Sequence, residues 1–288
     1  MNKQVLDYYT KHNCITDPGK YAAWLDALPT DLTDLHTAIN GLLIHIWKIR
    51  KYHSHLLESR STEVFIRHTQ YLLEEILKLD DRPFNVARPV EKQVIIDCRH
   101  FSTFLCSILR QQGIPARARC GFAAYLEDGF CMDHWVCEYW NSEQGRWITE
   151  DPDKKLHDVP PDQFITGARA WQLCRADDSA GSRFGFNAEA RGMWAARVNL
   201  VRDFAALNGF ESVSGDGWGL AMKTDADVTV DDTAILDQAA RLAVTDNNFE
   251  ERHSFYEETE TLRAPTIISN FDYVKSNDWR MVEWQKEP

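Results

Sequence analysis

Three residues of this chain have the side chains that covalent cysteine chemistry requires. Cys98 supplies a thiol, His134 an imidazole and Asp151 a carboxylate. An imidazole can take the proton of a thiol and make the sulfur nucleophilic, and a carboxylate can hold that imidazole in the correct tautomer. Together they predict acyl transfer through a thioester, in which Cys98 attacks, His134 moves the proton and Asp151 orients His134.

A predicted helix positions Cys98. Asp97 is a favourable N-cap, and apolar residues follow it at three- and four-residue intervals until Gly113 and Pro115 end the pattern. Cys98 therefore lies in the first turn, where unpaired backbone N–H groups and the positive end of the helix dipole point at the sulfur. We expect this position to favour the thiolate over the thiol.

Predicted strands position the other two residues. Alternating apolar residues, separated by Asp-Gly and Gln-Gly turn signals, indicate strands over residues 116–125, 133–140 and 146–149. His134 lies in the second strand, and Asp151 follows the third. A helix followed by an antiparallel sheet, rather than alternating strands and helices, indicates an α+β fold.

Further helices are predicted on both sides of this core. Apolar residues at helical spacing, or helix-ending signals, mark residues 31–47, 63–79, 187–208 and 233–244. No repeat or linker separates a second domain. We expect a single domain over residues 1–288, with a helical N-terminal part (1–90), a core (91–155) and a mainly helical, acidic C-terminal part (156–288).

Two other interpretations compete around His134. Glu150 and Asp153 flank Asp151, so spacing alone does not decide which carboxylate orients the imidazole. Cys131, His134 and Cys137 are three residues apart, as ligands of a zinc ion could be. In a strand, however, His134 points away from Cys137, and the three could share an ion only across a bulge. We therefore expect no metal and no cofactor.

Several nearby residues are weaker candidates for binding substrate. The backbone N–H of Cys98 is the expected oxyanion donor, and the Gln93 side chain or a tryptophan could complete the oxyanion hole. Trp135, next to His134, is a candidate wall of a substrate cleft. Arg99 and His100 could recognise an acidic group of a substrate, although solvated charge is their default interpretation.

Three sequence blocks, in this order, resemble the core of the transglutaminase-like superfamily. They are D-C-R-H-F-S with the following G-I-P-A-R-A-R-C-G-F, then D-H-W-V-C-E-Y-W, then R-W-I-T-E-D-P-D. The resemblance covers roughly residues 94–153, and the order of the blocks makes it specific. It implies a papain-like fold with Cys98 as nucleophile, His134 as general base and acid, and Asp151 as its orienter.

The chain departs from the family pattern immediately before the nucleophile. The superfamily often has glycine there, whereas this chain has Asp97. An anionic neighbour raises the pKa of a thiol unless its carboxylate is committed to capping the helix.

Composition limits the partners and the compartment. The chain has 288 residues, and 44 acidic against 32 basic residues give a net charge of −12, which argues against nucleic acid as a partner. Most of the excess of negative charge lies in residues 211–288, with 17 acidic and 7 basic side chains.

The N-terminus lacks the pattern of a secretory signal, and no apolar run approaches the ~20 residues of a membrane span. Seven scattered cysteines fit a reducing compartment. We expect a soluble, cytoplasmic protein without membrane partners.

These observations lead us to expect a cysteine-dependent amidase, peptidase or transamidase whose substrate is a peptide, a protein or a small amide. The alternative is a catalytically inactive transglutaminase-like domain that binds partners, for which Asp97 and the long unmatched flanks are the motive.

Overall fold

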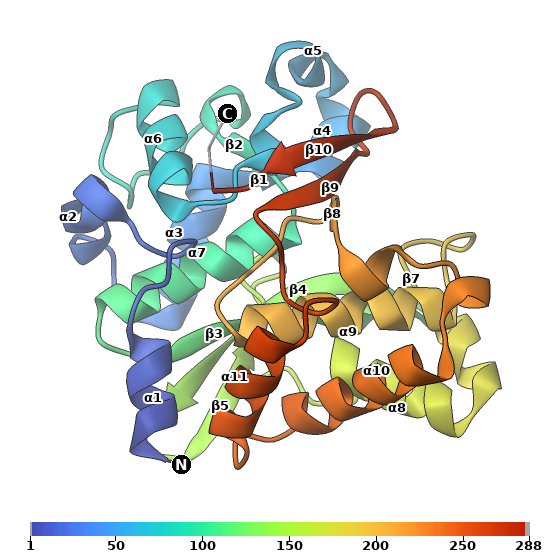
Figure 1. Cartoon of the computed structure of the whole chain (residues 1–288). Coiled ribbons are helices and arrows are strands. Elements are labelled where there is room, and N and C mark those ends of the chain that lie inside the picture. The colour runs from blue at the N-terminus through green and yellow to red at the C-terminus, as the bar shows by residue number, and fades with distance from the viewer. Residues whose placement is uncertain (1, 286–288) are drawn as a thin grey trace.

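The computed structural model describes residues 2–285 and combines helices with an antiparallel sheet (Figure 1). This arrangement confirms the expected α+β fold. The central sheet has the antiparallel strand order β5-β4-β3-β6, and a short strand, β7, pairs in parallel with β4. Its strands are β3 (Ala116–Glu127), β4 (Phe130–Asn141), β5 (Arg146–Glu150), β6 (Phe164–Thr166) and β7 (Phe184–Gly185).

Tight turns at the expected glycines connect the three longest strands of the central sheet. Gly129 joins β3 to β4 with a φ of 76°, and Gly145 joins β4 to β5 with a φ of 65°. Residues with a Cβ rarely adopt this left-handed region, so glycine at these positions favours the two hairpins. The hairpins place the strand of His134 between the strand that precedes it and the strand that leads to Asp151.

Two long helices cover the sheet. Apolar residues of α7 (Cys98–Gln111), such as Phe101 and Phe104, share a core cluster with Cys120 and Trp135 of the sheet. Helix α9 (Met193–Leu207) is buried along almost its whole length, and its Asp203 binds the sheet residue Arg119. Because neighbouring strand residues point to opposite faces, Cys120 and Arg119 place α7 and α9 on opposite sides of β3.

A network of buried charges joins the sheet to α9 and to the C-terminal part. Arg119 Nε lies 2.8 Å from Asp203 Oδ1, and Arg119 Nη1 lies 3.1 Å from Glu138 Oε2. Arg117 joins Glu138 at 2.7 Å to Asp246 at 2.6 Å. Because buried charges are costly to leave unpaired, losing one partner of such a pair destabilises a fold by about 3–5 kcal/mol. The network therefore fixes how α9 lies on the sheet.

The N-terminal part adds helices and one strand. Its helices are α1 (Lys3–Thr10), α2 (Ala22–Asp26), α3 (Leu32–Leu42), α4 (Ile46–Tyr52), α5 (Leu57–Arg60) and α6 (Thr69–Leu79). Strand β1 (Leu43–His45) pairs in parallel with β2 (Val94–Ile96), which leads directly into the helix of Cys98.

The predicted helix over residues 31–47 is wrong at residues 43–45. Strand β1 interrupts it, and the His45 ring, through Nδ1, accepts from the Trp47 N–H and starts α4 anew. Trp47, which the helical pattern assigned to the core, is 62% exposed. The helix predicted from residue 63 begins only at Thr69, because Glu63 instead binds Arg60 and the Ile95 N–H.

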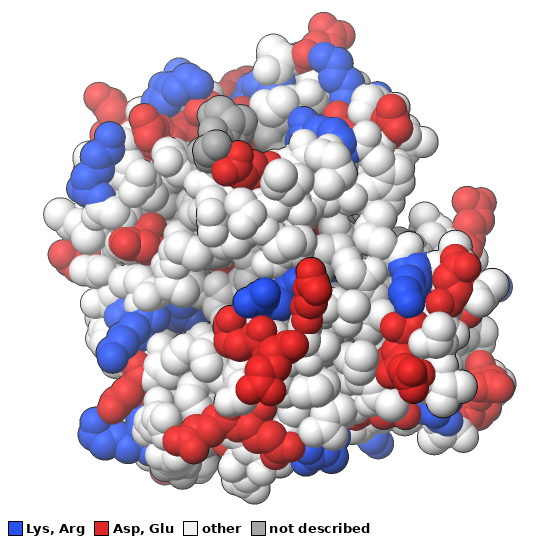
Figure 2. All heavy atoms as spheres, in the orientation of Figure 1, with Lys and Arg blue, Asp and Glu red and all other residues white. Residues whose placement is uncertain are grey.

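The C-terminal part contains two helices that overlap the predicted ranges, two further helices, and a small sheet that the sequence did not predict. The helices are α8 (Gly167–Ala176), α9, α10 (Val230–Ala243) and α11 (Phe249–Glu258), and the strands are β8 (Asp216–Gly217), β9 (Ile267–Asp272) and β10 (Asp278–Glu283). The β8–β9–β10 sheet lies beside α4 and α5 of the N-terminal part (Figure 1). Acidic side chains gather on the surface over α11 (Figure 2), so part of the negative excess of the C-terminal part is exposed there.

Candidate active site

Cys98 is the first residue of α7. The Asp97 side chain caps the helix by accepting from the Arg99 N–H at 3.1 Å, and the His100 ring completes a capping box. At its other end α7 stops at Gly113, whose φ of 77° suits only glycine well. The predicted N-cap and the helical position of Cys98 are therefore both present.

His134 and Asp151 form a buried hydrogen-bonded pair. His134 Nε2 lies 2.7 Å from Asp151 Oδ2, and the two residues are 2% and 0% exposed. Asp151 follows β5 directly, and its backbone pairs with Leu156 across the next turn. Strand β4 and this turn together hold the imidazole and the carboxylate in place.

The sulfur of Cys98 lies beside the strand that carries His134. The backbone N–H of Trp135, the residue after His134, donates to the sulfur. The charge of Asp153 raises the pKa of both Cys98 and His134, so it lies near both. Within residues 2–285 no hydrogen bond joins the Cys98 sulfur to His134. Because Nε2 is bound to Asp151, Nδ1 is the ring nitrogen left to receive a proton from the thiol.

The surroundings of the Cys98 thiol strongly oppose its ionisation. Burial raises the pKa of Cys98 well above its ordinary value, and the negative charges of Asp97, Asp133 and Asp153 raise it further, while the Trp135 N–H opposes the rise. Burial and the three carboxylates therefore oppose the thiolate that the helix N-terminus was expected to favour.

The imidazole and its carboxylate have opposite shifts. Burial alone would lower the pKa of His134, but the charge and hydrogen bond of Asp151 raise it above the ordinary value. For Asp151 the directions are reversed. Burial alone would raise its pKa, but His134 and the Tyr125 hydroxyl hold it at about 2. Asp151 therefore stays ionised beside His134 and stabilises an imidazolium.

Asp97 is committed to more than the helix cap. Its Oδ2 accepts from the Ser214 hydroxyl at 2.6 Å and from the Tyr273 hydroxyl at 3.0 Å. The carboxylate remains anionic, because its interaction with His100 and the hydrogen bonds from His100 and Ser214 hold its pKa low against the effect of burial. The C-terminal part thus contacts the residue next to the nucleophile, and capping does not cancel the effect of Asp97 on Cys98.

The two rivals of Asp151 bind other partners. Glu150 Oε2 lies 2.6 Å from His157 Nδ1 and 3.4 Å from His36 Nε2. Asp153 forms an ion pair with Lys154 at 2.8 Å. The neighbouring carboxylates Glu150 and Asp151 therefore serve different histidines, and Asp151 is the one bonded to His134.

Gln93 and Trp135 have structural partners in the resting fold. The Gln93 side chain donates to the Asn40 carbonyl at 2.7 Å, so its amide N–H is directed at the end of α3. Trp135 is fully buried in the cluster under α7. Neither side chain faces an open cleft here, although the Trp135 indole N–H has no hydrogen-bond partner within residues 2–285.

Arg99 and His100 are buried rather than solvated or open to a substrate. Arg99 Nε donates to the Glu211 carbonyl at 3.0 Å. The His100 ring lies between Asp97 Oδ1 at 2.8 Å and the Ile66 carbonyl at 2.7 Å. Both side chains anchor the first turn of α7 to the flanking parts of the chain.

Sequence reasoning missed two residues that support the pair. The Tyr125 hydroxyl donates to Asp151 Oδ2 at 2.6 Å. Asn40 donates to the Pro152 carbonyl at 2.6 Å and holds the turn that carries Asp151. The place of Tyr125 at the end of a predicted strand was a weak signal for its role, and the sequence carried none for Asn40.

The two cysteines near His134 lie in other surroundings. Cys137 Sγ is 3.3 Å from Cys106 Sγ of α7, and Cys131 packs with Phe122 and Phe184. His134 instead faces Asp151. Cys131, His134 and Cys137 therefore do not converge on one point.

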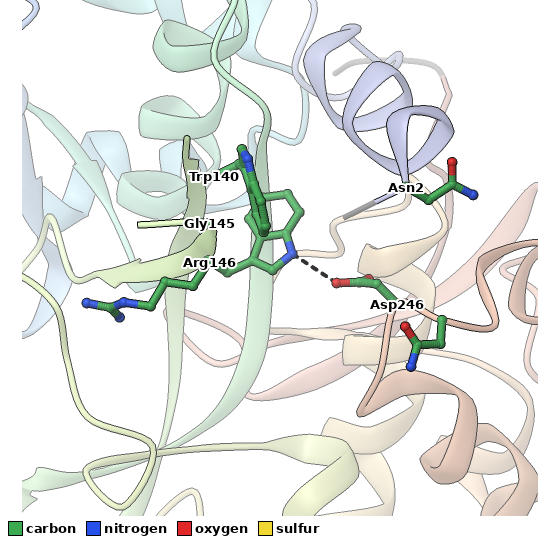
Figure 3. Close-up of a pocket in the computed structure, with 7 residues that line it drawn as sticks. Asn2, Trp140, Gly145, Arg146 and Asp246 are labelled. Atoms are coloured by element: carbon green, nitrogen blue, oxygen red, sulfur yellow. Dashed lines mark hydrogen bonds between the residues drawn. The ribbon is translucent and has the colours of Figure 1, made fainter. Parts of the chain in front are cut away.

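A hollow of about 460 Å³ lies away from Cys98, His134 and Asp151, where the β4–β5 hairpin meets the loop after α10. Its lining residues are Asn2, Trp140, Gly145, Arg146, Trp147, Asp246 and Asn247. Trp147 donates its indole N–H to Asp246 across it (Figure 3). None of the three candidate catalytic residues lines this hollow.

Across residues 2–285, no helix is both long enough and apolar enough to cross a bilayer.

Comparison with known proteins identifies the segment that carries these residues. Residues 61–152 match the family model of the transglutaminase-like superfamily, and no curated protein matches the chain. Among solved structures, the chain is similar to a candidate cysteine protease from Cytophaga hutchinsonii at 14% identity and a TM-score of 0.34. That similarity covers 58% of this chain and 46% of the other, so this chain spans less than half of its length. The segment that matches the model of the transglutaminase-like superfamily, residues 61–152, contains Cys98, His134 and Asp151.

Proposed function

We propose that this protein is a cysteine-dependent acyl-transfer enzyme that acts on an amide or peptide bond. The observation that carries the proposal is the buried His134–Asp151 pair, with the Trp135 N–H directed at the Cys98 sulfur. A nucleophile, a base and a group that orients the base are the parts that acyl transfer through a thioester needs. The transglutaminase-like match supports a cysteine-enzyme function of this kind.

The raised thiol pKa shapes the first step of the mechanism. Because Cys98 rests as a thiol, its proton passes to His134 Nδ1 as the sulfur attacks the carbonyl carbon. Asp151 stabilises the resulting imidazolium, and the backbone N–H of Cys98 at the helix N-terminus is directed at the developing oxyanion. His134 then gives its proton to the departing amine, and a thioester remains on Cys98.

The second step returns the enzyme to its resting form. Water or an amine attacks the thioester while His134 accepts its proton, and the Cys98 sulfur leaves with a proton from His134. Water makes the protein an amidase or peptidase, and an amine makes it a transamidase. A peptide, a protein or a small amide fits this chemistry.

Access to the sulfur requires movement. Cys98 is 7% exposed, and His134 is 2% exposed. Ser214 and Tyr273 of the C-terminal part are bonded to Asp97, beside the sulfur. We infer that this contact opens when a substrate binds.

The second candidate function is a transglutaminase-like domain that has lost turnover and binds partners. The burial of Cys98 and the three carboxylates that raise its pKa favour this alternative. The intact His134–Asp151 pair favours the enzyme.

Acylation by p-nitrophenyl acetate separates the two functions. If the protein is an acyl-transfer enzyme, we expect a burst of one p-nitrophenolate molecule per chain. We also expect an acetyl group on Cys98, which mass spectrometry would locate. Cys98→Ala abolishes the burst, while Cys14→Ser, which removes an exposed thiol, leaves it unchanged. Acetylation that spares Cys98, or that occurs equally in His134→Gln, assigns the inactive function instead.

A further inference from the structure

A second cluster of potential ligands lies on the other side of the Glu150–Asp151 dipeptide. It consists of His36 of α3, Glu150 at the end of β5 and His157 of the turn after Asp151. One ligand atom from each residue lies within 4.8 Å of the other two. Residues 121 positions apart in the chain thus converge, and none of the three serves the proposed acyl transfer.

His36 is an unusual member of this cluster, because its ring is fully buried without a hydrogen bond. It is 0% exposed, and neither ring nitrogen has a hydrogen-bond partner within residues 2–285. Its Nε2 faces Glu150 Oε2 at 3.4 Å, outside hydrogen-bond geometry. Buried polar groups are normally satisfied, so an unpartnered nitrogen aimed at a carboxylate indicates a missing ligand.

We propose that His36, Glu150 and His157 bind one divalent transition-metal ion of the zinc class. The ligand atoms are His36 Nε2, Glu150 Oε2 and His157 Nδ1, and a water molecule takes the fourth position. Two imidazoles and one carboxylate suit zinc-class ions, whereas calcium and magnesium prefer all-oxygen sites.

The separation between His36 and Glu150 fits such an ion, whereas the separation between His157 and Glu150 must increase. Two ligands at ~2.0–2.1 Å from a tetrahedral zinc lie roughly 3.4 Å apart, which is the separation of His36 Nε2 and Glu150 Oε2. The His157 Nδ1–Glu150 Oε2 separation of 2.6 Å is a hydrogen bond, and it must lengthen when the ion enters.

One of the two imidazole rings must also rotate when the ion binds. His36 and His157 stack in parallel, with centroids 4.6 Å apart and planes at 3°. An ion bound in the plane of both rings cannot lie between parallel rings, so one ring must rotate. His157 is the one that rotates, because its side chain is 39% exposed while His36 is enclosed.

The position of the site gives the ion a structural role beyond the proposed catalysis. His36 belongs to α3, whereas Glu150 and His157 lie at the two ends of the turn that contains Asp151. A bound ion ties this turn to α3 from the side opposite His134. Metal binding therefore does not depend on Cys98.

Zinc titration of the full-length protein, freed of metal with a chelator, tests the site. Competition with a chromophoric chelator is expected to give one ion per chain, and zinc is expected to raise the melting temperature. Glu150→Gln and His157→Ala each weaken binding by at least ~100-fold, since even partners outside the ligand shell cost 10–100-fold. His157→Ala alters a partly exposed side chain, so its fold is checked by circular dichroism.

Matched variants exclude binding elsewhere. Cys98→Ala and Cys14→Ser remove the nucleophile and an exposed thiol, and His55→Ala removes an exposed histidine. All three are expected to bind zinc as the wild type does. The proposal is overturned by an absence of stoichiometric binding, by unchanged affinity in His157→Ala and Glu150→Gln, or by loss of binding in Cys98→Ala, which would place the ion on the thiol. None of these results decides whether Cys98 is acylated.

Discussion

At the scale of single residues, the site depends on how one carboxylate is held. Asp151 Oδ2 receives both the His134 ring and the Tyr125 hydroxyl, and its Oδ1 accepts from the Lys154 N–H. These bonds to the ionised form keep the pKa of Asp151 at about 2 despite its burial. The same carboxylate raises the pKa of His134, so the two side chains are tuned as a pair.

Tyr125→Phe tests this arrangement. The change removes one hydrogen bond to a charged group, so the free energy of unfolding at pH 7 should fall by about 1.5–3 kcal/mol. It should also raise the pKa of Asp151. A carboxyl whose pKa is lower in the folded than in the unfolded protein stabilises the fold above pH ~3.8, and this stabilisation is lost as the pH falls toward about 2. Acid unfolding should therefore begin at a higher pH, as measured by chemical denaturation at several pH values. The exposed Tyr52→Phe is the control, and equal effects in both variants would contradict the account.

The sequence predicted some of these residues and not others. The blocks around Cys98, His134 and Asp151 were recognisable because each combines a residue type with a local element signal. The role of Tyr125 had only a weak signal in the sequence, because the β3–β4 register shifts between Ala123 and Glu127. Such a bulge changes the direction of the side chains after it and has no clear mark in the sequence.

At the scale of elements, the first turn of α7 is under two opposing influences. Its helix N-terminus favours a negative sulfur, whereas burial and the nearby carboxylates oppose one. Asp97 contributes to both, since it caps the helix and also carries a charge next to Cys98. Replacing the charge while keeping the cap separates these effects.

Asp97→Asn keeps an oxygen that can accept from the Arg99 N–H and removes the negative charge. We expect the pKa of the Cys98 thiol to fall, and the iodoacetamide reaction of Cys98 to begin at a lower pH in the Cys14→Ser background. The fold should lose about 1.5–3 kcal/mol, because the bonds from Ser214 and Tyr273 no longer end on a charge. Asp31→Asn, at the N-cap of α3, is the matched control. An unchanged alkylation profile in Asp97→Asn would show that Asp97 does not govern the thiol.

Elements with strong local signals were predicted, and elements that depend on distant partners were not. Helix α7 has an N-cap aspartate and a terminal glycine, and the central hairpins have turn glycines. Strand β1 reads as part of a helix because only its pairing with β2, about fifty residues later, makes it extended. Strand β8 has two residues, and β9 holds it in place.

At the scale of the whole molecule, buried histidines make stability depend on pH. His45 is 6% exposed, and burial lowers its pKa to about 4. Asp153 and Asp97 oppose this shift, while Lys154 and His134 add to it. A histidine with a lowered pKa in the fold stabilises it above its unfolded value of about 6.5, and this contribution is lost as the pH falls toward about 4.

The free energy of unfolding should therefore fall between pH 6.5 and 4. His45 should contribute about 3 kcal/mol to this fall, because its pKa drops from 6.5 to about 4 on folding and each pH unit between the two values corresponds to ~1.4 kcal/mol. His36, whose pKa is also lowered to about 4, adds to the loss in the same range. His134 has a raised pKa, so its contribution is lost above pH 6.5 instead. His45→Asn keeps an acceptor for the Trp47 N–H and should reduce the slope, measured by urea unfolding at each pH. The exposed His55→Asn should leave the slope unchanged, and an unaltered slope in His45→Asn would contradict the prediction.

The central claim is that His134 activates Cys98, and the pH dependence of acylation by p-nitrophenyl acetate tests it most directly. Only the neutral imidazole accepts the thiol proton, so the burst rate of the wild type should rise with pH through a midpoint above 6.5, where Asp151 places the pKa of His134. In His134→Gln this rise should disappear, and the rate at its plateau should fall by roughly 10²–10⁴-fold. A variant whose profile and rate match those of the wild type would show that Cys98 reacts without His134, and would contradict the account.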